Sequence, residues 1–154
     1  MKIGGVVENT GLTMYRIDAI TDRPGSAGAI LRLFAENNIS LQFITESSTT
    51  DGTAVMALCV NTSETGKIDR LIAEEKDLVG QIKIKKVEGV SILGIYVPHF
   101  REKPVLAAKF CKILGEAGTN ILGLASSISS INSVILSEEL DVARQALLSE
   151  FELP

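Results

Sequence analysis

One short loop, residues 21–27, combines the residue types that could hold a small charged molecule. It reads Thr-Asp-Arg-Pro-Gly-Ser-Ala and precedes a stretch with helical spacing. Gly25 and Ala27 let a ligand or another backbone come close. Free N–H groups at a helix start attract an anion such as a carboxylate, and Asp22 could accept a hydrogen bond from an ammonium group. The loop could therefore hold both ends of a zwitterion.

The same loop also has a purely structural interpretation. Asp22 would then cap the helix, Pro24 would stiffen the turn, and Gly25 would occupy a tight turn. Both interpretations use the same residues, so the residue types leave the choice between them open.

Other reactive residues are sparse. His99 is the only histidine, and Cys59 and Cys111 lack CxxC spacing, so neither a metal site nor a cofactor is expected. Both cysteines lie in apolar runs, which favours buried, reduced thiols. No glycine-rich phosphate-binding motif occurs, and nothing combines an acid, a base and a nucleophile. We therefore expect no catalytic residues and disfavour an enzyme.

The composition is that of a globular protein. The chain has 154 residues, of which 45% are hydrophobic and 22% charged. Its net charge is −4 and its basic residues are scattered, which argues against nucleic-acid binding. The N-terminus lacks a signal-peptide core, and no window has 18 consecutive apolar residues. We predict a cytoplasmic protein without a membrane partner.

The sequence repeats at a spacing of 80 residues. Residues 22–44 align with residues 102–124 over 23 positions without a gap. Asp22 meets Glu102, and Pro24 meets Pro104. An ungapped match of this length indicates a duplicated structural unit.

Each repeat follows the order strand, helix, strand, strand, helix, strand, which is the ferredoxin-like unit. In the first repeat, apolar residues at helical spacing predict inner faces formed by Ala27, Ile30, Leu31 and Phe34, and later by Ile68, Leu71 and Ile72. The expected elements are a strand over 15–19 with Ala19 facing inward, a helix ending at 37–38, strands over 39–49 and 53–60 around a turn at 50–52, a helix capped by Ser63, and a strand over 81–87.

The second repeat lacks its last strand. Its expected elements are a strand over 90–97, a helix near 104–117, strands near 120–128 and 131–136, and a helix capped by Ser137 with Leu140, Ala143, Leu147 and Phe151 inward. The N-terminus carries a surplus strand within residues 2–8. We predict that this strand completes the second unit, giving units of 10–88 and of 89–154 with 2–8.

The run D-R-P-G-S-A-G-A-I-L-R-L-F-A-E-N-N-I-S-L resembles the signature of the ACT domain. From Ile3-Gly4-Gly5-Val6, through E-A-G-T-N-I-L, to Leu153, the chain resembles the regulatory region, or the separate regulatory beta subunit, of aspartokinase. The resemblance implies an α+β fold of two ferredoxin-like ACT units packed side by side, a homodimer, and effector sites between units. It includes no kinase catalytic domain.

The resemblance also implies which residues bind the effector, which in aspartokinases is lysine or threonine. Aspartokinases often have glutamine where this chain has Glu46, which would favour a ligand with an extra cation. The second loop, residues 98–105, has no glycine after its proline and is bulkier, so the sequence leaves open whether it forms a second, equivalent site. The implied ligand positions are Asp22, Gly25, Ser26, Ala27, Ile39, Ser40, Leu41 and Glu46, with Ser126, Ser127 and Ile128 contributed by the partner unit.

These observations lead to one main hypothesis and one alternative. The main hypothesis is a non-catalytic regulatory module that binds an amino acid and controls an enzyme of amino-acid metabolism, with a biosynthetic enzyme subunit as its partner. The alternative is a structural or protein-interaction ACT module that binds no ligand.

Overall fold

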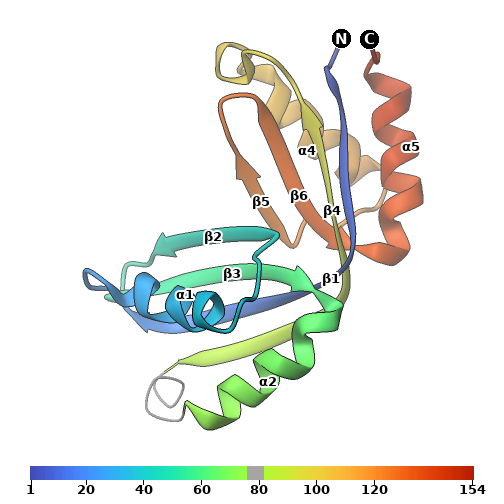
Figure 1. Ribbon diagram of the computed structural model, residues 1–154. Helices are drawn as coiled ribbons and strands as arrows, with labels where there is room; N and C mark the ends of the chain where they lie inside the picture. The colour runs from blue at the N-terminus through green and yellow to red at the C-terminus, as the bar shows by residue number, and fades with distance from the viewer. Residues whose placement is uncertain (76–81) are drawn as a thin grey trace. The chain divides into compact units, whose positions relative to one another are not determined.

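The computed structural model describes residues 1–75 and 82–154, and the chain forms two compact units (Figure 1). The first unit comprises residues 11–88, and the second comprises residues 1–10 together with 89–154. Two long strands, β1 (Gly5–Thr21) and β4 (Lys83–Tyr96), contribute to both units. They pass from one unit to the other at Gly11 and Gly89, which have φ angles of 70° and 66°.

In its described residues, 11–75 and 82–88, the first unit has a sheet in the order β2-β3-β1-β4 and two α-helices. Strand β3 pairs antiparallel with both β2 and β1, with Phe43 opposite Cys59 and Leu12 opposite Asn61. The elements are the second part of β1, α1 (Ser26–Glu36), β2 (Phe43–Ser48), β3 (Thr53–Asn61), a 3₁₀ turn (Thr62–Glu64), α2 (Thr65–Glu74) and the first part of β4.

Both predicted helical faces of the first unit are confirmed. Ile30 and Phe34 of α1 and Ile68 of α2 are buried in one cluster with Tyr15 and Ile17 of β1. The remaining predicted inner residues pack at the edge of this cluster. Both helices therefore cover the same face of the sheet, as expected for a ferredoxin-like unit.

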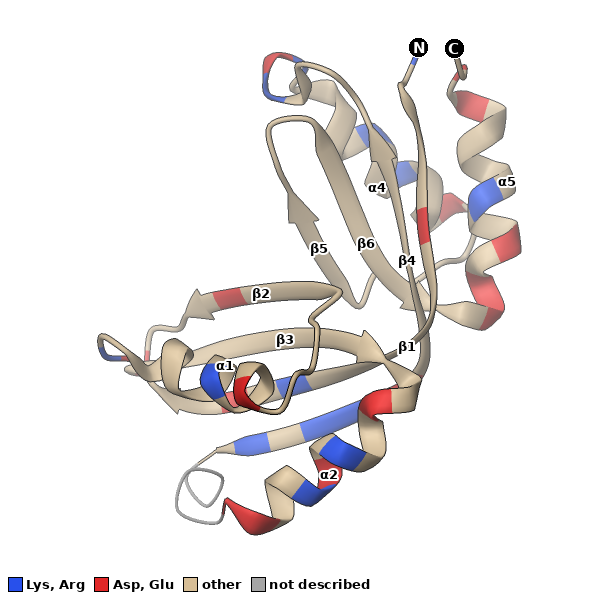
Figure 2. Cartoon of the chain, in the orientation of Figure 1, with Lys and Arg blue, Asp and Glu red and all other residues tan. Residues whose placement is uncertain are grey.

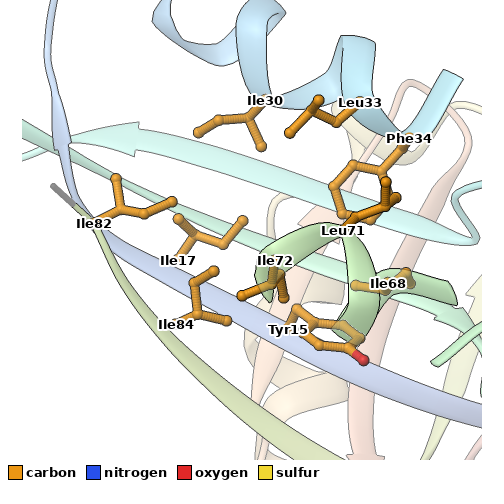
Figure 3. A pocket seen from close by; sticks show the side chains of 10 residues that line it. All are labelled: Tyr15, Ile17, Ile30, Leu33, Phe34, Ile68, Leu71, Ile72, Ile82 and Ile84. Carbon is orange, nitrogen blue, oxygen red and sulfur yellow. The ribbon is translucent and has the colours of Figure 1, made fainter. Parts of the chain in front are cut away.

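The helices of the first unit leave a small apolar cavity above the sheet. Figure 3 shows Ile30, Leu33 and Phe34 of α1 facing Leu71 and Ile72 of α2 across this space. Its volume is about 30 Å³, and ten lining side chains, including the Tyr15 ring, form it. Its walls expose no polar surface, so an ordered water would lack the hydrogen-bond partners that it needs there.

The second unit has a sheet in the order β1-β4-β6-β5, again with two helices. Strand β6 pairs antiparallel with β4 and β5. The elements are the second part of β4, a 3₁₀ turn (Phe100–Glu102), α4 (Val105–Glu116), β5 (Gly123–Ser126), β6 (Ser130–Leu136), a 3₁₀ turn (Ser137–Glu139), α5 (Leu140–Glu150) and the first part of β1.

The N-terminal residues complete the second unit, as predicted. The amide of Gly4 donates to the carbonyl of Tyr96 (2.7 Å), and that of Ile3 donates to the carbonyl of Glu152 (2.9 Å). Figure 1 shows the two chain termini next to each other, where Lys2 and Glu152 form a parallel bridge. Ile3 is buried with Phe151, whose place on the inner face of the last helical segment was also predicted. Leu140, Ala143 and Leu147 belong to the same core.

Several local predictions were wrong. Ser63 and Ser137 cap no helix, because each lies in a 3₁₀ turn that precedes the helix, and no side chain caps α2 or α5. The Ser137 hydroxyl instead lies 2.7 Å from that of Ser91. Strand β2 begins at Phe43 rather than at residue 39. Gln81, the expected start of the fourth strand, lies outside the described residues.

The end of β1 also differs from the predicted alternation. The pairing with β3 shifts between Ile17 and Ile20, and Ala19 within this bulge has a φ angle of 60°. Ile20, rather than Ala19, therefore joins the buried cluster. A bulge inserts one residue and turns the following side chains to the opposite face, which re-aims the chain as it enters the loop at 21–25.

Candidate functional site

A pocket of about 400 Å³ opens in the first unit beside the loop before α1. This volume falls in the range of small-molecule sites. Its walls come from four segments: the end of β1, the loop with the first turn of α1, strand β2, and the start of β3. The lining residues are Ile20, Thr21, Asp22, Arg23, Pro24, Gly25, Ser26, Ala27, Gly28, Glu46, Ser48 and Ala54.

The start of α1 lacks a side-chain cap. Gly25 is the N-cap residue with a φ angle of 91°, and no side chain caps the helix. The Ser26 amide donates to the carbonyl of Arg23 (3.2 Å), whereas the amides of Ala27 and Gly28 receive no side-chain acceptor. A Cβ atom at Gly25 would meet open space. The geometry suits a small anion placed against the helix start.

The structural interpretation of Asp22 as a helix cap is wrong. The carboxylate caps no amide of α1. Asp22 is exposed, and within residues 1–75 and 82–154 its side chain makes no hydrogen bond or ion pair. Its backbone is held instead, because its amide donates to the Gly52 carbonyl (3.1 Å). The carboxylate is thus available at the pocket wall.

The pocket wall carries both signs of charge. Asp22 and Arg23 adjoin in the loop, and Glu46 is the only charged residue of β2, where Figure 2 shows a single acidic band. Carboxylates can accept hydrogen bonds from ammonium groups, while the guanidinium and the helix amides donate to a carboxylate. The arrangement can therefore hold a zwitterion and one further cation.

The predicted site residues do not all line this pocket. Asp22, Gly25, Ser26, Ala27 and Glu46 lie together on its wall. The segment preceding β2 does not: Ile39 is buried in the first core, Leu41 packs against that core, and Ser40 is exposed outside the lining.

The second unit contains the three remaining predicted site residues. Ser126 ends β5, and Ser127 and Ile128 follow it as exposed residues. The Ser127 hydroxyl lies 2.9 Å from that of Ser130. Their contribution to an effector site stays a prediction.

Some lining residues were missed by the sequence analysis. Ser48 and Ala54 stand on either side of the hairpin turn, and Ile20 reaches the wall through the β1 bulge. Alternation along the hairpin was a usable signal for Ser48, because it lies two residues from Glu46 on the same face.

The histidine and the two cysteines do not line this pocket. His99 faces Glu102 at 3.7 Å on the exposed surface. Burial raises the pKa of the Cys59 thiol to about 12, which disfavours the nucleophilic thiolate. Among the residues that the structure describes, no three metal-binding side chains come together. None of the helices in these ranges has the length and apolarity needed to span a bilayer.

The pocket lies in a segment that matches a known family. Residues 16–80 match the model of the ACT domain. The chain is 28% identical over 157 residues to an aspartate kinase of Pseudomonas fluorescens and 26% identical over 152 residues to an aspartokinase of Mycolicibacterium smegmatis. These matches cover 98% and 97% of this chain but 37% and 36% of the relatives, so the chain spans little more than a third of their length.

Solved structures match over both units. The ligand-free regulatory subunit of aspartate kinase from Thermus thermophilus has a TM-score of 0.87 at 20% identity, covering 99% of this chain and 100% of that chain. A structure of aspartokinase alpha and beta subunits has a TM-score of 0.84 at 22% identity, covering 96% and 97%. Residues 16–80 of the chain thus resemble an ACT domain, and its two units have the tandem ferredoxin-like fold seen in aspartokinase regulatory subunits.

Proposed function

We propose that this chain is a non-catalytic regulatory module that binds an amino acid in the pocket beside Asp22. The observation that carries the proposal is the combination, on one wall, of uncapped amides at the start of α1 and a carboxylate without a partner among the described residues. The amides would receive the α-carboxylate, and Asp22 would receive the α-ammonium group. The ACT match over the same residues supports the assignment.

Ligand binding would stabilise the folded chain by mass action, and this gives a direct test. A ligand present at 100 times its Kd adds about 2.7 kcal/mol to the free energy of unfolding. Thermal unfolding and calorimetry against the twenty amino acids at millimolar concentration should identify at least one that raises Tm. The absence of any shift or heat would refute the proposal and favour the protein-interaction alternative.

Asp22→Ala should abolish the shift given by the identified amino acid. Glu102→Ala is the matched control, since Glu102 occupies the equivalent position of the second repeat and is likewise an exposed carboxylate. The control should keep wild-type affinity. Equal binding by Asp22→Ala and the wild type would place the ligand elsewhere.

We further propose that the module acts on a catalytic aspartokinase chain in the cytoplasm and that it forms a homodimer. The similarity to a structure described as containing aspartokinase alpha and beta subunits supports the choice of partner. Sedimentation analysis of the purified chain would test the dimer. Co-purification with an aspartokinase catalytic chain, with and without the effector, would test the partnership, and failure of the two to associate would refute it.

A further inference from the structure

The hairpin between β2 and β3 ends in a polar tip, residues 49–53. The Thr49 amide donates to the Thr53 carbonyl (2.8 Å), which leaves a three-residue loop. Gly52 takes the left-handed conformation with a φ angle of 80°. A three-residue hairpin loop places glycine at such a position.

The Asp51 carboxylate ties both ends of this tip together. One of its oxygens, Oδ1, accepts hydrogen bonds from the Thr53 hydroxyl (2.6 Å), from the Thr53 amide (3.1 Å) and from the Thr49 hydroxyl. The two threonine hydroxyls also lie 2.9 Å apart. These hydrogen bonds, led by those of Thr49 and Thr53, lower the pKa of Asp51. We call this group, formed by Thr49, Asp51 and Thr53, the tip clasp.

The tip clasp is exposed, so it adds little to global stability. Its position gives it a different consequence. Ser48 and Ala54, the residues immediately outside the clasp, line the pocket. The carbonyl of Gly52, inside the clasp, accepts the hydrogen bond from the Asp22 amide. One carboxylate therefore braces a turn that is flanked by two pocket-lining residues and is hydrogen-bonded to a third, Asp22, although Asp51 does not line the pocket itself.

The loop before α1 is bonded to the clasped turn where it begins. The loop follows the Ala19 bulge, which interrupts the pairing of β1 with β3. This pairing resumes with Ile20 opposite Ala54 and Thr21 opposite Thr53, directly before the loop. Thr53 thus belongs both to the clasp and to the last pairing before the loop. The Gly52 carbonyl then holds the next residue, Asp22.

We propose that Asp51 is a positioning residue for the effector site: by closing the tip clasp, it presents the Gly52 carbonyl that sets the place of Asp22. The proposal rests on the proposed function of the pocket. Preorganising a binding loop saves the cost of ordering it when the ligand binds. Loss of the clasp should therefore weaken binding without unfolding the protein.

The test compares four variants with the wild type. Asp51→Ala removes the acceptor, and Thr49→Val removes one donor while preserving the backbone and the strand preference. Asp51→Asn is the conservative variant, since its amide oxygen can accept the same hydrogen bonds. Thr50→Ala is the matched control, because Thr50 lies in the same tip but neither lines the pocket nor joins the clasp.

Two readouts separate positioning from stability. The first is the affinity for the amino acid found by thermal shift, which should fall about tenfold in Asp51→Ala and less in Thr49→Val. The second is hydrogen exchange of the Asp22 amide, which should accelerate in the same two variants while Tm stays within a few degrees. Asp51→Asn and Thr50→Ala should resemble the wild type in both.

Wild-type affinity and wild-type Asp22 exchange in Asp51→Ala would overturn the positioning role. So would weakened binding with unchanged Asp22 exchange, because the clasp would then act by another route. If Asp51→Ala fails to fold, Thr49→Val decides by the same two readouts. If the wild type binds no amino acid, the proposed function fails. Hydrogen exchange of the Asp22 amide then decides alone whether the clasp positions Asp22. Faster exchange in Asp51→Ala supports this role, and unchanged exchange overturns it.

Discussion

The loops before α1 and α4 occupy the same place in the repeat but use their backbones differently. The second loop closes on itself: it forms a 3₁₀ turn, and the Glu102 and Lys103 amides donate to the carbonyls of His99 and Phe100. The first loop also bonds internally, from the Arg23 and Ser26 amides, but its Asp22 amide bonds outward, to the carbonyl of Gly52. Neither α1 nor α4 has a side-chain cap. The two helices differ in their N-cap residue: Gly25, with a φ angle of 91° and no side chain, lets an anion approach the start of α1, whereas the bulkier Pro104 stands before α4.

The two hairpins repeat this contrast. The tip between β2 and β3 is organised by a carboxylate, Asp51, whereas the turn after β5 is held by the hydroxyls of Ser127 and Ser130. The two repeats thus share the same order of strands and helices, and their chemistry differs where their loops differ. The following changes would break or sharpen this comparison.

The largest effect should come from deleting residues 1–8, because the second unit takes its last strand from the N-terminus. The deletion removes Ile3 from the core, together with the ion pair that Glu8 forms with Arg144. Removal of one buried isoleucine side chain costs about 2–5 kcal/mol, so urea unfolding should show a loss of at least that size. Ile3→Ala should give an intermediate loss. An unchanged unfolding midpoint in the deletion would contradict the interlocked arrangement.

The next effect concerns Gly25, the residue that gives the first loop its open form. Its φ angle of 91° is unfavourable for any residue with a Cβ atom, so Gly25→Ala should cost about 1–2 kcal/mol. Gly28→Ala is the matched control within the same helix. Its Cβ would meet open space, and its helical conformation suits alanine, so it should gain about 0.4–1 kcal/mol. Chemical denaturation that gave both variants the same sign would contradict this description of the loop.

Helix α2 gives a smaller, pH-dependent effect. Partial burial raises the pKa of Asp69, but hydrogen bonds from Lys86 (2.9 Å) and the Tyr15 hydroxyl (2.8 Å) outweigh it, and the net pKa is lowered from 3.8. A lowered pKa contributes stability above the ordinary value, and this stability is lost as pH falls through the folded-state pKa. Since Asp69 is 47% exposed, screening limits the contribution to less than about 1 kcal/mol.

Denaturation of Asp69→Asn at several pH values would measure this contribution. The variant should be less stable than the wild type at pH 7, and the difference should shrink as pH falls below about 4. Tyr15→Phe should cost about 1 kcal/mol at neutral pH. A difference between Asp69→Asn and the wild type that stays constant down to pH 2 would exclude the ionised carboxylate as its source.

Hydrophobic spacing predicted most of the fold because it depends on many residues at once. The sequence pattern predicted the inner faces of α1 and α5, the repeat and the N-terminal strand. Each of these predictions would stand even if one of its residues were different. The helix caps at Ser63 and Ser137 depended on single residues, and a 3₁₀ turn before each helix was enough to make them wrong. The bulge at Ala19 had no signal in the alternating sequence, since alanine rarely takes a positive φ angle.

The residues that line the pocket also divide into those that the sequence could predict and those that it could not. Four residues of the pocket wall could be predicted because they lie in the first turn of α1 or just before it: Asp22, Gly25, Ser26 and Ala27. Ser48 and Ala54 depend on hairpin register, where a slip of one residue reverses every side chain. The role of Gly52 depends on a backbone hydrogen bond between distant loops, which the sequence does not encode locally.

The smallest expected effect tests what distinguishes the two units in charge. Glu46 stands on the pocket wall, whereas the residue at the same repeat spacing in the second unit is Ser126. An exposed ion pair is worth about 0.2–1 kcal/mol. Glu46→Gln should therefore lower the ratio of lysine to threonine affinity by up to about fivefold, by weakening the lysine interaction alone.

Calorimetric titration of both amino acids into the variant would measure this ratio, with Glu36→Gln as the control. Glu36 is an exposed carboxylate of the same unit that does not line the pocket, so it reports any general effect of removing one negative charge. The effect of Glu46→Gln should also shrink at high salt, because screening weakens an exposed ion pair. An unchanged affinity ratio in Glu46→Gln would mean that the ligand's side chain does not reach β2, and that the wall formed by Asp22 and α1 alone selects the effector.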